Sequence, residues 1–193
     1  MSITTEFLRR PLMTGAVAAS SRRLAHAMTE GIGLERARLV AELGSGTGVF
    51  TDAILARLAP DARLVAVELN PLLAARLSAT RRDSRLTVVQ GSAAGLADAV
   101  GEPVDAVVSG LPWTVMPQDR RGYVLDAVTE VLAPGGRFTT FAYLHAAWTP
   151  PARHFTAELA CRFDRLERSR TVWANLPPAF AHRATLGPRI APR

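Results

Sequence analysis

Short apolar runs alternate with stretches of helical periodicity between residues 38 and 144. Five runs are rich in Val, Leu and Ala and lead into a polar or glycine-containing turn, as is typical of buried parallel strands. They span residues 38–43, 63–68, 85–89, 104–109 and 137–144. Because helical stretches separate the runs, the pattern predicts right-handed strand–helix–strand units and a parallel sheet with helices on both faces.

The helices between these strands have recognisable starts. Asn70-Pro71 favours the start of a helix, because Asn is a good N-cap and Pro fits the first turn. Ser20 or Ser21 similarly caps a helix that runs to about Glu30. The other predicted helices span residues 49–58, 71–80, 118–132 and 151–160, with a short one after the turn 91–93.

The pattern changes after His145. Residues 162–173 and 179–186 have the composition of two longer, more polar strands. We expect them to form an antiparallel pair at one edge of the sheet, which gives a seven-stranded, mostly parallel α/β sheet. A chain of 193 residues is about one domain in length. We divide it into N-terminal cap helices at 1–33 and a cofactor-binding domain at 34–193.

The first strand leads into the turn Glu42-Leu43-Gly44-Ser45-Gly46-Thr47-Gly48, which opens the next helix. Glycines let a backbone approach a ligand closely, and unpaired N–H groups at the helix start face the same place. A dinucleotide fingerprint has its third glycine one residue later, and no Lys-Ser or Lys-Thr follows, so a triphosphate loop is excluded. Glu42 disfavours phosphate and suits a cationic ligand. The alternative is a turn that only joins strand to helix.

A second acid, Glu68, ends the next strand 20 residues after Gly48 and suits the hydroxyls of a ribose. Together, E-L-G-x-G-T-G and V-E-L-N resemble motifs I and II of the class I S-adenosylmethionine (SAM) methyltransferases. The resemblance implies a Rossmann-like fold, SAM as donor, S-adenosylhomocysteine as product and Leu69 against the adenine. It also implies an adenine-binding turn at 91–93, where Ser92 replaces a common Asp. The candidate cofactor-binding residues are Glu42, Gly44, Ser45, Gly46, Thr47, Gly48, Glu68, Leu69, Asn70, Gly91, Ser92, Ala93 and Ser109.

In an open α/β sheet, ligands bind beyond the carboxyl ends of the strands, so the turns after the fourth and fifth strands are candidates for the acceptor site. The fourth strand leads into Ser109-Gly110-Leu111-Pro112-Trp113. Enzymes that methylate the amino group of adenine carry Asn or Asp here, then Pro and an aromatic residue that stacks on the base. In this chain Ser109 lacks the amide. Trp113 either stacks on the acceptor or packs in the core.

After the fifth strand, Tyr143, His145 and Trp148 bring aromatic rings and an imidazole to the same edge. Aromatic faces attract an amine that becomes a permanent cation on methylation, and His145 or the Tyr143 hydroxyl could accept the ammonium proton. The alternative is that all three are packing residues. The candidate catalytic residues are Tyr143 and His145, and the candidate substrate-binding residues are Gly110, Leu111, Trp113, Tyr143 and Trp148. Displacement from a sulfonium needs no metal, and the four His residues are scattered along the chain.

Composition narrows the choice of partners. All 23 basic residues are Arg, which excludes lysine chemistry, and the net charge of +6 favours nucleic acid or an acidic membrane surface. The single Cys161 permits no internal disulfide, as in a reducing cytoplasm, and we expect it to be buried. No apolar run reaches the roughly 18 residues that span a bilayer. Ile3 and Phe7 share a helical face away from Arg9 and Arg10, which suits either membrane contact or a helix that caps the fold.

The resemblance extends along nearly the whole chain. Bacterial phospholipid N-methyltransferases of the rhizobial type, distant relatives of ribosomal RNA adenine dimethyltransferases, resemble this chain at Phe7-Leu8-Arg9, at Ser109-Gly110-Leu111-Pro112, at Phe141-x-Tyr143 and along residues 172–180. The resemblance implies stepwise methylation of phosphatidylethanolamine towards phosphatidylcholine. It also implies a peripheral protein on the cytoplasmic face of the bacterial membrane. The short leader, the Ser92 turn and the region after residue 143 depart from the family, so the acceptor and the number of methyl groups stay open.

Three other functions stay open. A ribosomal RNA adenine N6-methyltransferase agrees with the basic charge, but Ser109 and the lack of a helical RNA-binding domain after the sheet make nucleic acid the less favoured partner. A soluble small-molecule methyltransferase would turn over without a lipid surface. A SAM-binding protein without enzymatic activity would bind the cofactor and transfer nothing.

Overall fold

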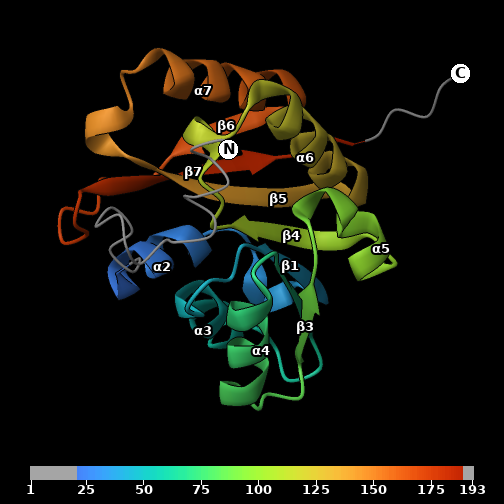
Figure 1. The fold of residues 1–193 in the computed structure, drawn as a ribbon. Helices are drawn as coiled ribbons and strands as arrows, with labels where there is room; N and C mark the ends of the chain where they lie inside the picture. Colours follow the sequence, from blue (N-terminus) through green and yellow to red (C-terminus); the bar gives the residue numbers. More distant parts are fainter. Residues whose placement is uncertain (1–20, 189–193) are drawn as a thin grey trace, which may run out of the picture.

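The computed structural model describes residues 21–188, which include a seven-stranded sheet in the order β3-β2-β1-β4-β5-β7-β6 (Figure 1). The strands are β1 (Leu39–Leu43), β2 (Arg63–Glu68), β3 (Leu86–Gln90), β4 (Val104–Ser109), β5 (Leu132–Tyr143), β6 (Arg165–Arg168) and β7 (Ala179–Thr185). Strands β1 to β5 are parallel, and β7 lies antiparallel between β5 and β6. The predicted mostly parallel sheet with an antiparallel C-terminal pair is confirmed.

Helices cover both faces of the sheet. The α-helices are α2 (Arg22–Thr29), α3 (Val49–Leu55), α4 (Pro71–Thr80), α5 (Leu96–Val100), α6 (Gln118–Val131) and α7 (Pro150–Arg162), and the 3-10 helices are η1 (Leu34–Arg36), η2 (Ala93–Gly95), η3 (Trp113–Val115) and η4 (Leu144–Ala146). Leu125 of α6 and Phe155 of α7 are buried in one cluster, and Leu24 of α2 and Ile54 of α3 are buried in another. Figure 1 shows these two pairs of helices on opposite sides of the sheet.

Local sequence explains where key elements begin. The Ser21 side chain caps α2 by accepting a hydrogen bond from the Leu24 N–H at 3.1 Å. Asn70 caps α4 in the same way, accepting from the Leu72 N–H at 2.9 Å, and Pro71 occupies the first turn. Every residue of β1 is buried, because a central parallel strand is covered on both faces. The glycine turn that follows β1 therefore starts in the middle of the sheet.

The structure differs from the predicted elements at four places. Strand β6 is limited to Arg165–Arg168, because α7 continues through Arg162 and the regular ladder with β7 ends after Arg168. There the Ala181 N–H donates to the Ser169 side chain, and only an isolated bridge joins Val172 to Ala179. Strand β5 begins earlier, at Leu132, where it pairs with the start of β4 ahead of a register shift. Helix α3 ends at Leu55, three residues before the predicted end. Cys161 is exposed on α7 rather than buried.

Helix α2 belongs to the same core as the sheet. Leu24 and Met28 are fully buried, and α2 packs against α3 and β7. The amphipathic helix expected at 1–13 lies outside the described residues. Within residues 21–188, no helix has the length and apolar character needed to cross a bilayer.

Candidate active site

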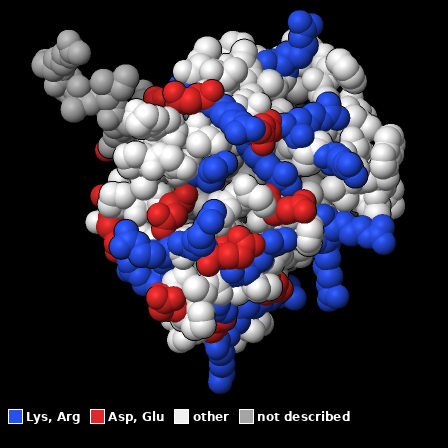
Figure 2. All heavy atoms as spheres, turned by 180° about the vertical axis from the view of Figure 1, so that it is seen from behind, with Lys and Arg blue, Asp and Glu red and all other residues white. Residues whose placement is uncertain are grey.

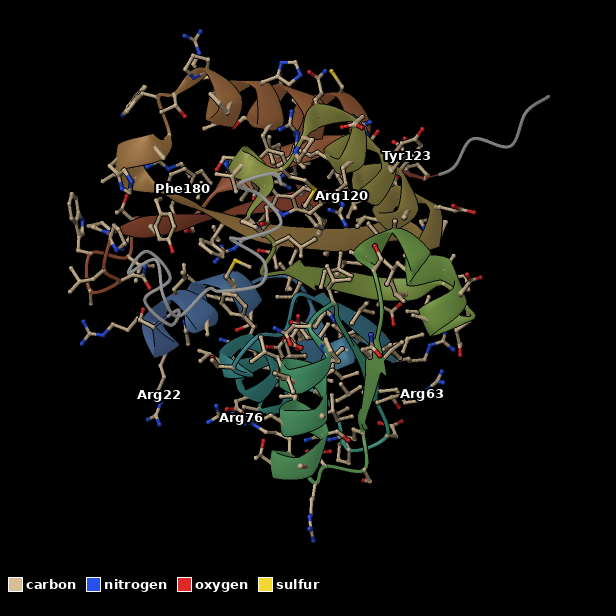
Figure 3. All side chains as sticks on the ribbon, viewed as in Figure 1. Arg22, Arg63, Arg76, Arg120, Tyr123 and Phe180 are labelled. Atoms are coloured by element: carbon tan, nitrogen blue, oxygen red, sulfur yellow. The ribbon has the colours of Figure 1, made fainter. Side chains whose placement is uncertain are left out.

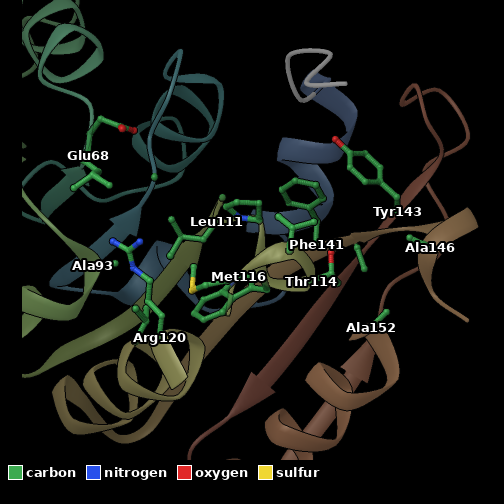
Figure 4. A pocket seen from close by; sticks show the side chains of 18 of the residues that line it. Glu68, Ala93, Leu111, Thr114, Met116, Arg120, Phe141, Tyr143, Ala146 and Ala152 are labelled. Carbon is green, nitrogen blue, oxygen red and sulfur yellow. The ribbon is translucent and has the colours of Figure 1, made fainter. Parts of the chain in front are cut away.

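A cavity of about 1110 Å³ lies at the carboxyl ends of the parallel strands. Its walls come from the turns after β1, β2, β3 and β4, from the end of β5 with η4, and from the loop ahead of β7. Ligand pockets are typically about 300–1,000 Å³, so this cavity has room for a cofactor and part of an acceptor. Among the described residues that line it, Glu68 is the only carboxylate and Arg120 the only arginine (Figure 4). No cluster of His, Cys, Asp or Glu within residues 21–188 is arranged to hold a metal ion.

Glu68 is held in one orientation at the end of β2. Its Oε2 accepts the Gly46 N–H at 2.8 Å, and its Oε1 accepts the Asn70 N–H at 2.9 Å. The residue is buried on most of its surface and still lines the cavity. Each carboxylate oxygen can accept more than one hydrogen bond, so both keep capacity for the two hydroxyls of a ribose. The structure therefore places the predicted ribose acceptor in the cavity and ties it to the glycine turn.

Two glycines allow the turns after β1 and β4 to touch. A Cβ on Gly110 would lie 2.8 Å from the Gly44 carbonyl oxygen and 3.2 Å from Phe50 Cε2. A Cβ on Gly44 would lie 2.9 Å from Leu111 Cδ2, and the Gly44 φ of +72° is in the region that side chains disfavour. Since Gly44, Gly110 and Leu111 line the cavity, the close approach of the two turns shapes its wall.

Glu42 lies beneath the glycine turn and does not line the cavity. It is fully buried, its Oε2 accepts the Thr51 hydroxyl at 2.6 Å, and its Oε1 has no partner among residues 21–188. Burial raises the pKa of Glu42 to about 8, because a charged carboxylate is poorly solvated there. An unpartnered oxygen under the turn fits a cationic group, but contact with the cofactor stays a prediction for Glu42. The same holds for residues 45–48, none of which lines the cavity.

Small and apolar residues line the cavity next to Glu68. Leu69 is 44 % exposed, and it lines the cavity together with the turn 91–93 that follows β3. Ser92 caps η2 through its Oγ, which accepts the Ala94 N–H at 3.3 Å. A carboxylate for the ribose, an apolar wall for the adenine and a closely approaching glycine turn together fit SAM.

Three rings from β5 and η4 form the other end of the cavity. Phe141 and Tyr143 meet edge to face with 5.5 Å between ring centroids, and Tyr143 stacks on His145 at 5.8 Å with 21° between planes. All three line the cavity. Burial raises the pKa of Tyr143 above its ordinary value, so its hydroxyl stays protonated at neutral pH. The structure brings the two predicted catalytic residues together and adds Phe141, which is not among the sequence candidates.

Ser109 binds the protein's own Trp113, which corrects its assignment to the cofactor. Its buried Oγ accepts the indole Nε1–H at 3.0 Å, and Ser109 does not line the cavity. Trp113 does line the cavity, but only 2 % of its surface is exposed, because it stacks on Phe155 at 5.2 Å with 13° between planes. Trp113 is therefore a wall residue with little free surface for an acceptor.

Trp148 is a second correction, since it does not join the aromatic wall. It is 78 % exposed and does not line the cavity, although His145 and Ala146 before it and Ala152 after it do. Leu176, Pro177 and Pro178 line that side instead. They are held there by a long-range contact, in which the Leu144 N–H donates to the Pro178 carbonyl at 2.8 Å, and local sequence patterns do not reveal such a contact.

An ion pair that sequence reasoning missed supports the cavity loop. Arg121 of α6 is buried and binds Glu158 of α7 through two hydrogen bonds of 2.6 and 2.9 Å. Its Nη1 also donates to the carbonyls of Trp113 and Met116 at 3.4 Å. The Arg121 guanidinium holds the pKa of Glu158 below its ordinary value. The sequence does contain a signal for the burial of Arg121, because this residue lies at helical spacing before Val124, on the apolar stripe of α6.

Comparisons with known proteins agree with this arrangement. Residues 40–136 match a family described as a methyltransferase domain. An ornithine lipid N-methyltransferase from Singulisphaera acidiphila is 32 % identical over 183 residues, which cover 92 % of this chain and 91 % of that protein. A ribosomal RNA small subunit methyltransferase A from Kineococcus radiotolerans is 33 % identical over 135 residues, which cover 60 % of this chain and 44 % of that protein.

Solved structures share the fold. The O-methyltransferase TomG from Streptomyces achromogenes, in complex with SAM, matches with a TM-score of 0.66 at 20 % identity, over 95 % of this chain and 88 % of that one. The cavity described above lies beyond the carboxyl ends of the parallel strands, where this class of sheet binds its ligands.

Proposed function

The chain belongs to the SAM-dependent methyltransferases, and from that premise we propose that it methylates the amine of an aminolipid headgroup at a membrane surface. The observation that carries the proposal is the aromatic end of the cavity. There Phe141, Tyr143 and His145 meet, whereas Glu68, the only carboxylate among the described lining residues, lies on the other side of the cavity from Tyr143 (Figure 4). The lipid N-methyltransferase that matches 92 % of the chain supports the same acceptor class.

The aromatic end suits the charge that develops on the amine. When bound, SAM would supply an electrophilic methyl group to a neutral amine nitrogen, and S-adenosylhomocysteine would be the leaving group. The low dielectric of the cavity favours the neutral amine before transfer, and aromatic faces attract the ammonium ion afterwards. The Tyr143 hydroxyl, which stays protonated, can accept a hydrogen bond from the amine and orient its lone pair. His145 can take up the proton that the methylated amine releases.

Arg120 offers a partner for the anionic part of a headgroup. It is exposed at the start of α6, and its side chain has no hydrogen bond or ion pair with the described part of the chain. Figure 4 shows its side chain beside Ala93, on the side of the cavity that carries Glu68 and across the cavity from Tyr143. Phosphatidylethanolamine, the acceptor that the sequence resemblance implies, carries a phosphate near its amine, and an ornithine lipid, the acceptor of the Singulisphaera relative by name, carries a carboxylate. Arginine binds either anion, so both lipids are candidate acceptors. We take phosphatidylethanolamine first, because the sequence resemblance implies it, and ornithine lipid second.

Methylation of RNA adenine is less well supported. The buried Ser109 Oγ accepts hydrogen bonds from the Trp113 indole N–H at 3.0 Å and from the Leu111 N–H at 3.4 Å. Both of its lone pairs are therefore occupied, and it is not free to accept a hydrogen bond from the amino group of adenine. Trp113 itself is stacked on Phe155 and exposes little surface to a base. The match to the ribosomal RNA methyltransferase covers 60 % of this chain and 44 % of that protein, whereas the match to the lipid N-methyltransferase covers 92 % and 91 %.

The proposed place of action is the cytoplasmic face of a bacterial membrane. The net charge of +6 suits the anionic lipids of such a surface. The basic apolar segment at 1–13 lies outside the described residues, and its contact with membrane stays a prediction.

Turnover of water-soluble acceptors tests the proposal. Purified protein would receive methyl-labelled SAM with short-chain phosphatidylethanolamine, short-chain ornithine lipid, free ethanolamine or total RNA. We expect at least one of the two lipids to be methylated with a kcat/KM well above that of ethanolamine. Arg120→Gln should raise KM for the lipid about tenfold, as loss of a charge-assisted hydrogen bond of about 1.5 kcal/mol would, without changing SAM affinity.

Arg76→Gln is the matched control, because Arg76 is an exposed arginine on α4 (Figure 3) and does not line the cavity. Its kinetic constants should equal those of the wild type. Transfer to ethanolamine and lipid at equal kcat/KM would contradict headgroup recognition, and transfer to RNA alone would replace the proposed acceptor.

A further inference from the structure

We propose that the exposed side chains of Trp148, Trp173 and Leu176, named the tryptophan rim from here on, dock the protein on an anionic lipid bilayer beside the opening of the cavity. The inference rests on the proposed function, because it supplies the surface by which the cavity reaches a lipid headgroup. It goes beyond that function by naming the residues that enter the membrane interface.

The tryptophan rim is a group of large apolar side chains left in solvent. Trp148, Trp173 and Leu176 are 78 %, 70 % and 76 % exposed. Their two loops are joined, since the Leu144 N–H donates to the Pro178 carbonyl at 2.8 Å, and Figure 1 shows both loops at the left of the molecule. Exposed apolar side chains that gather at one place mark an interaction surface. Tryptophan is enriched at membrane interfaces, because its ring is apolar and carries one polar N–H.

The rim is continuous with the aromatic end of the cavity. Leu176 lines the cavity together with His145 and Ala146, and Ala146 lies two residues before Trp148. A bilayer in contact with the rim would therefore lie next to the end of the cavity where Tyr143 and His145 are placed to receive an amine. A lipid could then insert its headgroup while its acyl chains stay in the membrane.

The charges around the rim complement an anionic surface. Segments 143–157 and 168–185 contain no Asp or Glu, and Arg153 and Arg170 are exposed on them. In Figure 2, arginine lies among uncharged atoms along the right margin, which is the side that carries these loops. Anionic headgroups attract such a surface, whereas carboxylates there would repel them.

The N-terminal segment joins the fold at the same place. Ser21, the first described residue, donates its N–H to Asn175 Oδ1 at 3.0 Å, and Asn175 lies in the loop that carries Trp173 and Leu176. The preceding 20 residues include Phe7, Leu8, Arg9 and Arg10, whose sequence suits either membrane contact or a helix that caps the fold. They are therefore connected to the described fold beside the tryptophan rim, which adds a second reason for this side to face the bilayer.

Vesicle binding and tryptophan fluorescence test the inference. The full chain would be mixed with vesicles of phosphatidylcholine and phosphatidylglycerol, with and without brominated acyl chains. Trp148→Ser and Trp173→Ser should each weaken vesicle binding about tenfold, which corresponds to roughly 55 Å² of apolar surface no longer withdrawn from water. Brominated lipid should quench the emission of both tryptophans in the wild type and spare Trp113, which is 2 % exposed. Tyr123→Ser is the matched control, because Tyr123 is 71 % exposed on α6, at the opposite side of Figure 3 from Phe180 on β7.

The outcomes separate the rim from the acceptor assignment. The double variant should lose vesicle binding and keep SAM affinity and turnover of monomeric short-chain aminolipid. Vesicle binding equal to that of the wild type would overturn the inference, and so would a dimer that the substitutions dissociate, since a second copy of the chain would then occupy the surface. The wild type could methylate no aminolipid while the double variant, Trp148→Ser with Trp173→Ser, loses vesicle binding. In that case the proposed function fails and the docking surface stands.

Discussion

Replacement of Glu68 perturbs the cofactor site at its best-defined residue. Its two oxygens accept the N–H groups of Gly46 and Asn70 at 2.8 and 2.9 Å, and among the described residues it is the only carboxylate that lines the cavity. Glu68→Ala removes the acceptors for both ribose hydroxyls. A hydrogen bond to a charged group contributes about 1.5–3 kcal/mol. Two such bonds, partly replaced by water, give a loss of about 3 kcal/mol, which raises the Kd of the cofactor about 150-fold.

The assay must separate ribose contact from loosening of the glycine turn, because the same substitution frees two backbone N–H groups. Calorimetric titration with S-adenosylhomocysteine and its 2′-deoxy analogue does so. The wild type should bind the deoxy analogue about tenfold more weakly, as loss of one such bond predicts, and Glu68→Ala should bind the two equally. Glu102→Gln is the control, because Glu102 is an exposed acid paired with Arg63 outside the cavity. Unchanged cofactor affinity in Glu68→Ala, or equal binding of both ligands by the wild type, would refute the ribose assignment.

Three further predictions concern packing and charge. Gly110→Ala should lower both cofactor affinity and the free energy of unfolding, because its Cβ would lie 2.8 Å from a backbone oxygen of the turn after β1. Gly95→Ala should change neither, because no atom lies within 4 Å of its Cβ. Equal effects of the two substitutions in calorimetry and urea titration would contradict this. Burial raises the pKa of Glu42 from 4.5 to about 8, so the folded state holds a proton that the unfolded state releases. The free energy of unfolding of the cofactor-free protein should therefore fall as the pH rises between these values; Glu42→Gln should lack that fall, and parallel pH curves for the two proteins would disprove it. Arg121→Met should cost about 3 kcal/mol of unfolding free energy, because it leaves Glu158 partly buried with only the half-exposed His154 as a partner among the described residues, at 3.1 Å. Adding Glu158→Leu should recover part of that loss, and a larger loss in the double variant would count against the ion pair.

The sequence predicts the cofactor half of the site because that half is local. The turn after β1, the acid that ends β2 and the turn after β3 are each continuous in sequence, and a parallel sheet brings their carboxyl ends together. The resemblance to SAM methyltransferases is confirmed by the family match at residues 40–136 and by the lipid N-methyltransferase that covers most of the chain. Glu68 lies in the cavity where the sequence places it.

The acceptor half was less predictable because it depends on contacts between distant segments. Ser109 is paired with Trp113 by a buried hydrogen bond. The sequence predicts that its side chain contacts the cofactor, whereas in the fold it holds the Trp113 ring. Arg121 and Glu158 are 37 residues apart, and no local pattern pairs them. Trp148 follows Tyr143 closely in sequence, yet its side chain is exposed to solvent and does not line the cavity. Side-chain direction after a strand end is set by tertiary packing, which periodicity does not encode.

We propose above that a lipid amine is methylated at the aromatic end of this cavity. The most direct test offers the purified protein methyl-labelled SAM with vesicles of phosphatidylethanolamine and phosphatidylglycerol, in parallel with ornithine lipid vesicles and total RNA. We expect label in the organic phase, carried on the headgroup nitrogen when the product is separated by thin-layer chromatography. Label confined to RNA, or no label in any acceptor by a protein that binds SAM, would contradict it.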